Sequence, residues 1–298
     1  MADVLKKIVQ ENDFKNGSLV VSVNKFGDII HTINPKINDD SVITNQSGIL
    51  DTRFDDVKYY IARTTRTTAA AAQAAFEEWS QKGGDIDGEA DNDRSGYSVS
   101  LSSNGSIVAI GAIYNDGTGS NAGHTRVYEY SGSAWVQRGS DIDGEAASDQ
   151  SGYSVSLSSD GSIMAIGAIY NDDAGSNAGH TRVYEWNGSA WVQKGSDLDG
   201  EAVNDNSGYS VSLSNDGSIV AIGANLNDGT GSQAGHTRVY EWNGSAWVQM
   251  GSDIDGEAAG DYSGQSVSLS NDGRTVAIGA ILNDGTASNA GHVRVYAG

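Results

Sequence analysis

The stretch DIDGEADNDRSGYSVSLSSNGSIVAIGAIYNDGTGSNAGHTRVYEYSGSAWVQRGS, residues 85–140, decides the fold because the chain repeats it. Copies begin at Asp85, Asp141, Asp197 and Asp253, so each step is 56 residues long. Residues 85–140 and 141–196 differ at ten of their 56 positions. Self-similarity at a fixed period is the sequence signature of repeat architectures. The repeat is therefore the unit to interpret.

Each repeat contains four stretches that predict β-strands. In the first, Tyr97, Val99 and Leu101 alternate with serines, as expected for a strand with one buried face. The second is apolar on both faces and is expected to lie between layers. The predicted strands of the first repeat are Gly96–Ser102, Ser106–Ala112, His124–Tyr130 and Ala134–Gly139. Four antiparallel strands in every repeat are typical of β-propeller blades.

The two ends of the array predict that the ring closes. The last repeat stops at HVRVYAG, after its third strand, and so lacks the Trp-containing fourth strand. WSQKGG (Trp79–Gly84) matches WVQRGS of the first repeat and can supply that strand from the N-terminal side. This arrangement leaves no exposed edge. The prediction is an all-β fold, a four-bladed β-propeller over residues 79–298 that is closed by an N-terminal strand.

The repeated motifs resemble those of the FG-GAP family, which forms the propellers of integrin α-chains and occurs in many bacterial surface proteins. SGYSVSLS, VAIGA and GHTRVYEY are similar to three strand motifs of that family and recur in the same order four times over about residues 79–298. The family often has a DxDxDG calcium loop between its first two strands. The corresponding loops here are SSNGS, SSDGS, SNDGS and SNDGR, which are too short and too poor in carboxylates for calcium at that place.

Residues 1–70 are a different kind of sequence, and we interpret them as a docking or anchoring segment. LKKIVQEN predicts a short helix, SLVVSVNKFGDIIHTI predicts a hairpin, and DDVKYYIART predicts a further strand or helix. Residues 71–78 are expected to form an Ala-rich helical connector. Together, the segment and the connector loosely resemble parts of bacteriophage fibres and capsid-decoration proteins, which are commonly trimeric. That resemblance predicts a homo-oligomer and a viral capsid or tail protein as the partner of residues 1–70.

Charge and composition exclude several classes of protein. Residues 1–70 hold nine Lys/Arg and nine Asp/Glu, so the net charge of −21 comes entirely from residues 71–298. Such a surface repels nucleic acid and anionic membranes. The chain has no Cys, which excludes disulfides and thiolate metal sites. We expect no membrane insertion, and the opening MADVLKKIVQENDF lacks the apolar core of a cleaved signal peptide.

The acidic loop that opens each repeat is a candidate calcium site. Asp85, Asp87, Glu89 and Asp93 stand at relative positions 1, 3, 5 and 9, a spacing that can wrap oxygens around a hard cation. The same residue types recur at Asp141, Asp143, Glu145, Asp149, Asp197, Asp199, Glu201, Asp205, Asp253, Asp255, Glu257 and Asp261. Against calcium, Gly88 stands at position 4 rather than 6, and no bidentate ligand stands at position 12. The alternative is a solvated turn whose Asp side chains cap backbone amides.

Other repeated residues are expected to be structural. His124, His180, His236 and His292 are 56 residues apart, and we expect each ring to bond neighbouring backbone. The tryptophans at strand positions are expected to pack between blades rather than to stack on sugars. Any residue present in four copies is more easily explained by the fold than by one active site. No nucleophile–base pair or zinc-protease motif is present, so we expect no enzyme.

The sequence therefore predicts a virion surface protein, a phage fibre or capsid-decoration protein that displays its propeller for host-surface contact or shell decoration. The partner on the host side would be a surface glycan or protein. The alternative is a cellular adhesion or carbohydrate-binding propeller at the cell surface or secreted. A hydrolase on a propeller scaffold is the weakest hypothesis, since it needs a polar cluster that breaks the repeat symmetry. The main break is Gln265, which replaces the Tyr of the other blades.

Overall fold

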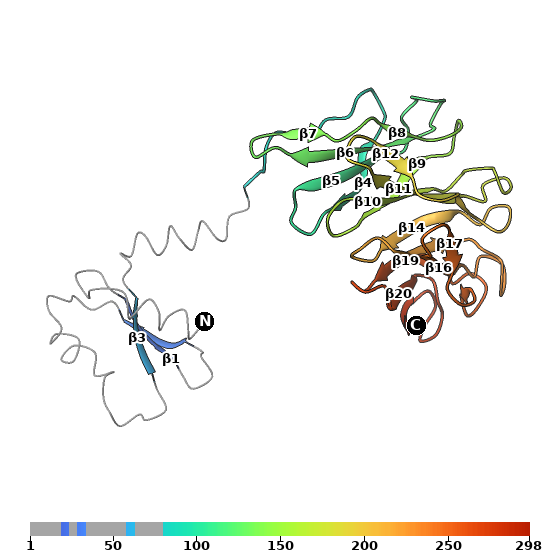
Figure 1. The fold of residues 1–298 in the computed structure, drawn as a ribbon. Coiled ribbons are helices and arrows are strands. Elements are labelled where there is room, and N and C mark those ends of the chain that lie inside the picture. Colours follow the sequence, from blue (N-terminus) through green and yellow to red (C-terminus); the bar gives the residue numbers. More distant parts are fainter. Residues whose placement is uncertain (1–18, 24–28, 34–57, 63–79) are drawn as a thin grey trace, which may run out of the picture. The chain divides into compact units, whose positions relative to one another are not determined.

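The computed structural model describes residues 19–23, 29–33, 58–62 and 80–298. The chain divides into two compact units, Met1–Gln81 and Lys82–Gly298. The regular elements of the described residues are all strands, which confirms the predicted all-β class (Figure 1). Within this part of the chain, no helix has the length and apolar character needed to cross a membrane.

The described residues of the first unit form a small antiparallel sheet in the order β2-β1-β3. Its strands are β1 (Leu19–Val23), β2 (Ile29–Ile33) and β3 (Lys58–Ala62). The pairing of β1 with β2 confirms the predicted hairpin, and β3 pairs with the other edge of β1 as a strand rather than a helix. The helix predicted for LKKIVQEN and the Ala-rich connector at residues 71–78 lie outside the described residues.

Each repeat of the second unit folds into its own antiparallel sheet, as the strand pattern predicts. Strands with the same place in the repeat recur at intervals of 56 residues. The first sheet contains β4 (Ser95–Leu101), β5 (Ile107–Ala112), β6 (His124–Tyr130) and β7 (Trp135–Gln137). The second contains β9 (Ser151–Leu157), β10 (Ile163–Ala168), β11 (His180–Trp186) and β12 (Trp191–Gln193). The third contains β14 (Ser207–Leu213), β15 (Ile219–Ala224), β16 (His236–Trp242) and β17 (Trp247–Gln249). The fourth contains β19 (Ser263–Leu269), β20 (Thr275–Ala280) and β21 (His292–Ala297).

Three two-residue strands link the first three sheets of the second unit to the repeats that follow them. They are β8 (Ile142–Asp143), β13 (Leu198–Asp199) and β18 (Ile254–Asp255). Each pairs with the third strand of the preceding sheet, for example β8 with β6 and β13 with β11. The acidic loop that opens a repeat is therefore attached to the sheet before it.

The hydrophobic core lies between neighbouring sheets. At the first junction, Ile107 and Val127 of one sheet pack with Leu157, Met164 and Ile166 of the next. The second strands of the middle sheets supply side chains to both junctions that flank them, which explains why β10 and β15 are buried along their whole length. The tryptophans of the fourth strands also pack at these junctions, as predicted, and the indole Nε1 of Trp191 donates to the Arg138 carbonyl at 2.8 Å.

The predicted closure of the ring is not found. In the described residues the last sheet has three strands and residues 80–84 form no strand. The indole of Trp135 donates to the Lys82 carbonyl at 2.7 Å, the same bond that Trp191 and Trp247 make to the preceding repeat, but no sheet accompanies Lys82 there. Trp79, the other end of the predicted closing strand, lies outside the described residues. The four blades instead form an open series (Figure 1). Apolar side chains are exposed at both of its ends, with Val99 at 65% and Val295 at 64%. The physical reason is that, in the described residues, no sheet covers these two positions, whereas the equivalents of Val295 in the other blades, such as Val183 at 1%, are buried against the next sheet.

Candidate functional site

The long connections of every repeat lie at one end of its sheet. Because neighbouring strands are antiparallel, the connection between the second and third strands shares this end with the acidic loop that opens the next repeat. The two are bonded to each other, since Thr118 Oγ1 donates to the Gly144 carbonyl at 2.6 Å and Ser148 N donates to the Ser120 carbonyl at 2.8 Å. We call this surface the loop face; it comprises residues 85–94, 113–123, 141–150, 169–179, 197–206, 225–235, 253–262 and 281–291.

The last carboxylate of each predicted calcium loop is buried and holds the loop in shape. Asp149 accepts hydrogen bonds from Ala146 N at 2.9 Å and from Asn171 Nδ2 at 3.3 Å. Burial raises the pKa of Asp149, and these two bonds act in the opposite direction. The equivalent residues with the same two kinds of bond are Asp93, Asp205 and Asp261. This is the capping role that the sequence left open as the alternative to calcium.

The first two Asp residues of each loop belong to other local contacts. Asp141 accepts a hydrogen bond from Gln137 Nε2 at 2.6 Å, and Asp197 and Asp253 accept the same bond from Gln193 and Gln249. The backbone carbonyls of the second Asp, at Asp87, Asp143, Asp199 and Asp255, accept from the guanidinium groups of Arg126, Arg182, Arg238 and Arg294. The side chains of Asp85 and Asp87 are exposed.

The glutamate of each loop lies between an arginine and a histidine. In the second repeat, Glu145 Oε1 is 3.5 Å from Arg182 Nη1, and Glu145 Oε2 is 3.8 Å from His180 Nδ1. The other repeats hold the same contacts at Glu89, Glu201 and Glu257. The four carboxylates expected to act together within one loop thus separate, with the glutamate turned towards the third strand and the last aspartate turned into the loop.

The histidines occupy an environment that the sequence did not predict. His124, His180 and His236 are each 1% exposed, and their Nδ1 atoms have no hydrogen-bond partner. The rings of His124 and His236 therefore make no bond to neighbouring backbone through either nitrogen, and the ring of His180 makes none through Nδ1. In each case an Asp carboxylate of the next repeat approaches the ring, as Asp197 Oδ2 does at 4.0 Å from His180 Nδ1. Sequence reasoning missed this grouping because its members come from two successive repeats.

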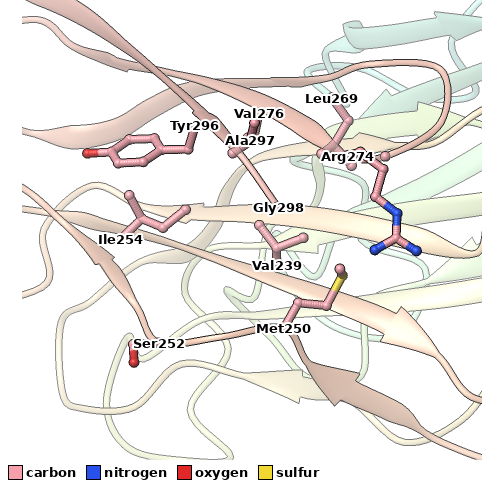
Figure 2. A pocket seen from close by; sticks show the side chains of 11 residues that line it. Val239, Met250, Ser252, Ile254, Leu269, Arg274, Val276, Tyr296, Ala297 and Gly298 are labelled. Atoms are coloured by element: carbon pink, nitrogen blue, oxygen red, sulfur yellow. The ribbon is translucent and has the colours of Figure 1, made fainter.

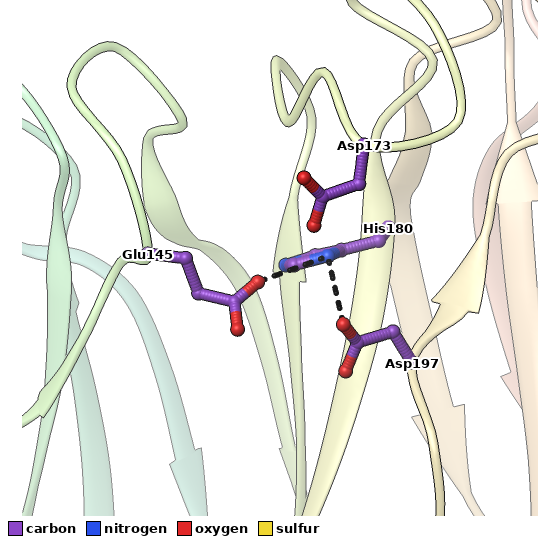
Figure 3. A group of neighbouring side chains, drawn as sticks. All are labelled: Glu145, Asp173, His180 and Asp197. Atoms are coloured by element: carbon purple, nitrogen blue, oxygen red, sulfur yellow. Dashed lines mark ion pairs between the residues drawn. The ribbon is translucent and has the colours of Figure 1, made fainter.

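Among the residues that the structure describes, three groups of possible metal ligands result, and the second repeat holds the largest (Figure 3). Glu89, His124 and Asp141 form one group, and Glu201, His236 and Asp253 form another. In the second repeat Asp173 joins Glu145, His180 and Asp197, and the four ligand atoms lie within 4.8 Å of one another. Asp173 replaces the glycine found at positions 117, 229 and 285. This substitution, visible in the sequence, is the signal that would have located the group.

The electrostatics of this group leave its charges incompletely balanced. Burial raises the pKa of Glu145; Arg182 lowers it, and the charges of Asp197 and Asp173 raise it further. Burial lowers the pKa of His180 to about 4, and Arg182 lowers it further. The imidazole is therefore neutral at neutral pH, and the arginine is the cation in contact with Glu145.

A separate apolar cavity of about 220 Å³ lies between the third and fourth sheets (Figure 2). Its lining includes Met250 and Ile254 from the third repeat and Val276 and Tyr296 from the fourth. At the preceding junctions a tryptophan indole donates to the carbonyl of Arg138 or Lys194, the residues equivalent to Met250. The cavity therefore lies at the junction with the fourth sheet, which in the described residues has no Trp-bearing fourth strand.

Comparison with known proteins supports the repeat assignment. The FG-GAP repeat family matches residues 141–184 and 254–296, which include β9, β10 and most of β11, and β19, β20 and most of β21. These repeats indicate an adhesion-type propeller domain, and the resemblance seen in the sequence is confirmed over these residues. No curated protein matches the chain. Among solved structures, hydrazine synthase of Kuenenia stuttgartiensis is similar with a TM-score of 0.42 and 12% identity, over 67% of this chain and 58% of that one.

Proposed function

We propose that this chain is a non-enzymatic binding protein that displays its repeats so that the loop face contacts an external surface. The observation that carries the proposal is the continuity of the loop face. Hydrogen bonds join the 113–123 loop to the acidic loop of the second repeat, and equivalent bonds such as Asn204 N to the Ser176 carbonyl recur at the next junction. The matched FG-GAP repeats are typical of adhesion-type domains and support the same function.

Repetition favours binding to a surface that itself presents many copies of a ligand. Similar loops recur along one face, so several weak contacts can form at once and their combined strength exceeds that of each contact. The loop face is rich in exposed carboxylates, including Asp116, Asp172, Asp228 and Asp284. Such a face favours basic groups, or polar groups held through cations, over an anionic surface.

We further propose that the protein is a virion surface protein, either a fibre or a capsid decoration, with residues 1–70 as the anchor to a capsid or tail protein. The division of the chain near Gln81 supports separate roles for the two units. The balanced charge of residues 1–70 and the excess negative charge of residues 71–298 support them as well. In this proposal the chain is a homotrimer, and the repeats face the host.

A cellular adhesion or carbohydrate-binding protein is the second candidate, favoured by the FG-GAP repeats alone. The partner of residues 1–70 distinguishes the two candidates. Chemical cross-linking of the full chain to a capsid or tail protein supports the first, and cross-linking to a cell-envelope protein supports the second.

The binding proposal is tested with labelled full-length protein on a glycan array and on candidate host cells. The loop-face variant replaces Asp116, Asp172, Asp228 and Asp284 with Asn, which keeps an oxygen acceptor for the loop amides that these carboxylates bond. We expect binding to fall by about tenfold or more, because several weak contacts are lost together.

The matched control also removes four carboxylates but leaves the loop face intact. It combines Asp160→Asn, Asp216→Asn and Asp272→Asn in the tight turns with Glu241→Gln in the third strand of the third sheet. We expect this control to bind like the wild type. Equal losses in both variants would show that only overall charge matters, and absence of binding by the wild type to every surface would contradict the proposal.

A further inference from the structure

The second repeat places four metal-ligating side chains around one point, and each reaches it from a different part of the chain. Glu145 comes from the acidic loop, Asp173 from the loop after β10, His180 from the first position of β11, and Asp197 from the segment before β13. Figure 3 shows the three carboxylates around the imidazole of His180. Their ligand atoms lie within 4.8 Å of one another.

Glu145 and Asp197 each have one carboxylate oxygen held by a second side chain, while the other oxygen faces His180. Arg182 lies beside Glu145 Oε1 at 3.5 Å, and Glu145 Oε2 is 3.8 Å from His180 Nδ1. Gln193 Nε2 donates to Asp197 Oδ1 at 2.5 Å, and Asp197 Oδ2 is 4.0 Å from the same nitrogen. Outer partners of this kind orient the ligands in protein metal sites.

The histidine gives an independent indication of a ligand. The side chain of His180 is 1% exposed, and its Nδ1, which faces Glu145 and Asp197, has no hydrogen-bond partner. Buried polar atoms normally have a partner, because leaving one without costs free energy. The distances of 3.8 and 4.0 Å to the carboxylate oxygens are too long for hydrogen bonds. They are close to the ~3.4 Å that separates donors around a tetrahedral ion with bonds of about 2.1 Å.

We propose that Glu145, Asp173, His180 and Asp197 bind one divalent transition-metal ion of the Zn²⁺ class. A neutral imidazole is a preferred ligand of such ions, whereas Ca²⁺ and Mg²⁺ prefer oxygen ligands alone. The ion would offset the mutual repulsion of the three carboxylates. It would also join the second repeat to Asp197 at the start of the third.

The other repeats are internal controls for this site. The first and third contain the glutamate, the histidine and the next repeat's aspartate, but they have Gly117 and Gly229 in place of Asp173. In the fourth, Glu257 is 3.6 Å from His292, whose side chain is 25% exposed. The Nδ1 atoms of His124 and His236 also lack a hydrogen-bond partner, so the fourth donor, Asp173, is what distinguishes the second repeat among the described residues. The second repeat alone is therefore assigned the ion.

The test uses the full chain after treatment with a chelator and dialysis into chelator-free buffer. Calorimetric titration with Zn²⁺ alone is expected to show one tightly bound equivalent, and the melting temperature is expected to rise on binding. The variant Asp173→Gly recreates the residue of the other repeats and is expected to weaken Zn²⁺ binding by more than about tenfold, since even loss of an outer partner costs about 10–100-fold. Glu185→Gln, which removes one carboxylate paired with Lys194 outside this group, is the matched control.

A second variant restores the site elsewhere. Gly229→Asp with Thr230→Ala, made in the Asp173→Gly chain, rebuilds in the third repeat the Asp173-Ala174 pair of the second. We expect it to recover one Zn²⁺ equivalent, and Co²⁺ bound there should give the absorption spectrum of a histidine- and carboxylate-ligated ion. Absence of Zn²⁺ binding by the wild type, or equal binding by wild type and Asp173→Gly, would overturn the proposal. Equal competition by Ca²⁺ would overturn the transition-metal assignment.

Discussion

At the scale of single residues, the glycine in the repeated IGA motif permits neighbouring sheets to touch through their backbones. A Cβ added at Gly167 would lie 2.1 Å from the Gly208 carbonyl oxygen of the next sheet. The Ser154 hydroxyl donates to that same oxygen at 2.7 Å. The motif is visible in the sequence, but the reason for the glycine is not, because the group it avoids lies in the following repeat.

We therefore expect Gly167→Ala to destabilise the protein by about 1–3 kcal/mol, the usual cost of overpacking a well-packed contact. Gly279→Ala is the matched control, because the nearest atom to its added Cβ is the movable Ser266 hydroxyl at 2.5 Å and no carbonyl of a following sheet is near. Urea unfolding measures both variants. Equal losses of unfolding free energy would show that contact between sheets is not the cause.

At the scale of elements, the tight turns between the first and second strands depend on one side-chain oxygen. Asp216 Oδ1 accepts hydrogen bonds from Ser218 N, Ser218 Oγ and Ser214 Oγ at 3.0, 2.8 and 2.7 Å. In the first repeat Asn104 makes the same bonds without a charge. The sequence predicts the turn from its residue types. It does not tell how strongly the carboxylate is held.

This difference between a charged Asp and an uncharged Asn predicts that the stability of the protein depends on pH through the Asp residues. The bond from Ser218 N and then that from Ser214 lower the pKa of Asp216 below its ordinary value of 3.8. At Asp160 burial acts in the opposite direction, but the bonds from Ser162 and Ser158 outweigh it and the pKa is again lowered. A group whose pKa is lower when folded stabilises the protein above its unfolded pKa, and this contribution is lost as the pH falls through the folded pKa.

The variant Asp160→Asn/Asp216→Asn should therefore lose less stability than the wild type below about pH 4. We expect the gap in melting temperature between variant and wild type to change by about 2 °C between pH 5 and pH 3. The reverse substitution, Asn104→Asp, should steepen the dependence. Parallel curves for all three proteins would show that the bonded carboxylates do not titrate differently on folding.

How far the sequence predicts these elements depends on where their partners lie. The main strands of each repeat were predicted to within a few residues, because alternation and turn residues are local signals. The strand β8 was missed because Ile142–Asp143 pairs with β6 of the preceding repeat. The group around His180 was missed for the same reason, since Asp197 belongs to the next repeat. Contacts between repeats cannot be predicted from the sequence pattern of a single repeat.

At the scale of the whole second unit, the repeat pattern predicts the blades but not their rotation relative to one another. Ring closure was inferred from matching motifs at the two ends, whereas the angle between sheets is set by packing at each junction. Val155 and Leu157 of the second sheet pack against the first sheet. Their equivalents Val99 and Leu101 have no sheet before them and are 65% and 59% exposed. The loop face runs along this open series, and the ligand groups around His124, His180 and His236 each join one repeat to the next.

The most direct test of the open series compares two equivalent leucines by urea unfolding of the full chain. Leu157→Ala removes a side chain that is 8% exposed, and we expect a loss of about 2–5 kcal/mol. Leu101→Ala removes its equivalent at the free end, where it is 59% exposed, and we expect a loss below about 1 kcal/mol. Equal, large losses in the two variants would contradict the account, because they would mean that another sheet covers Leu101 and that the ring is closed.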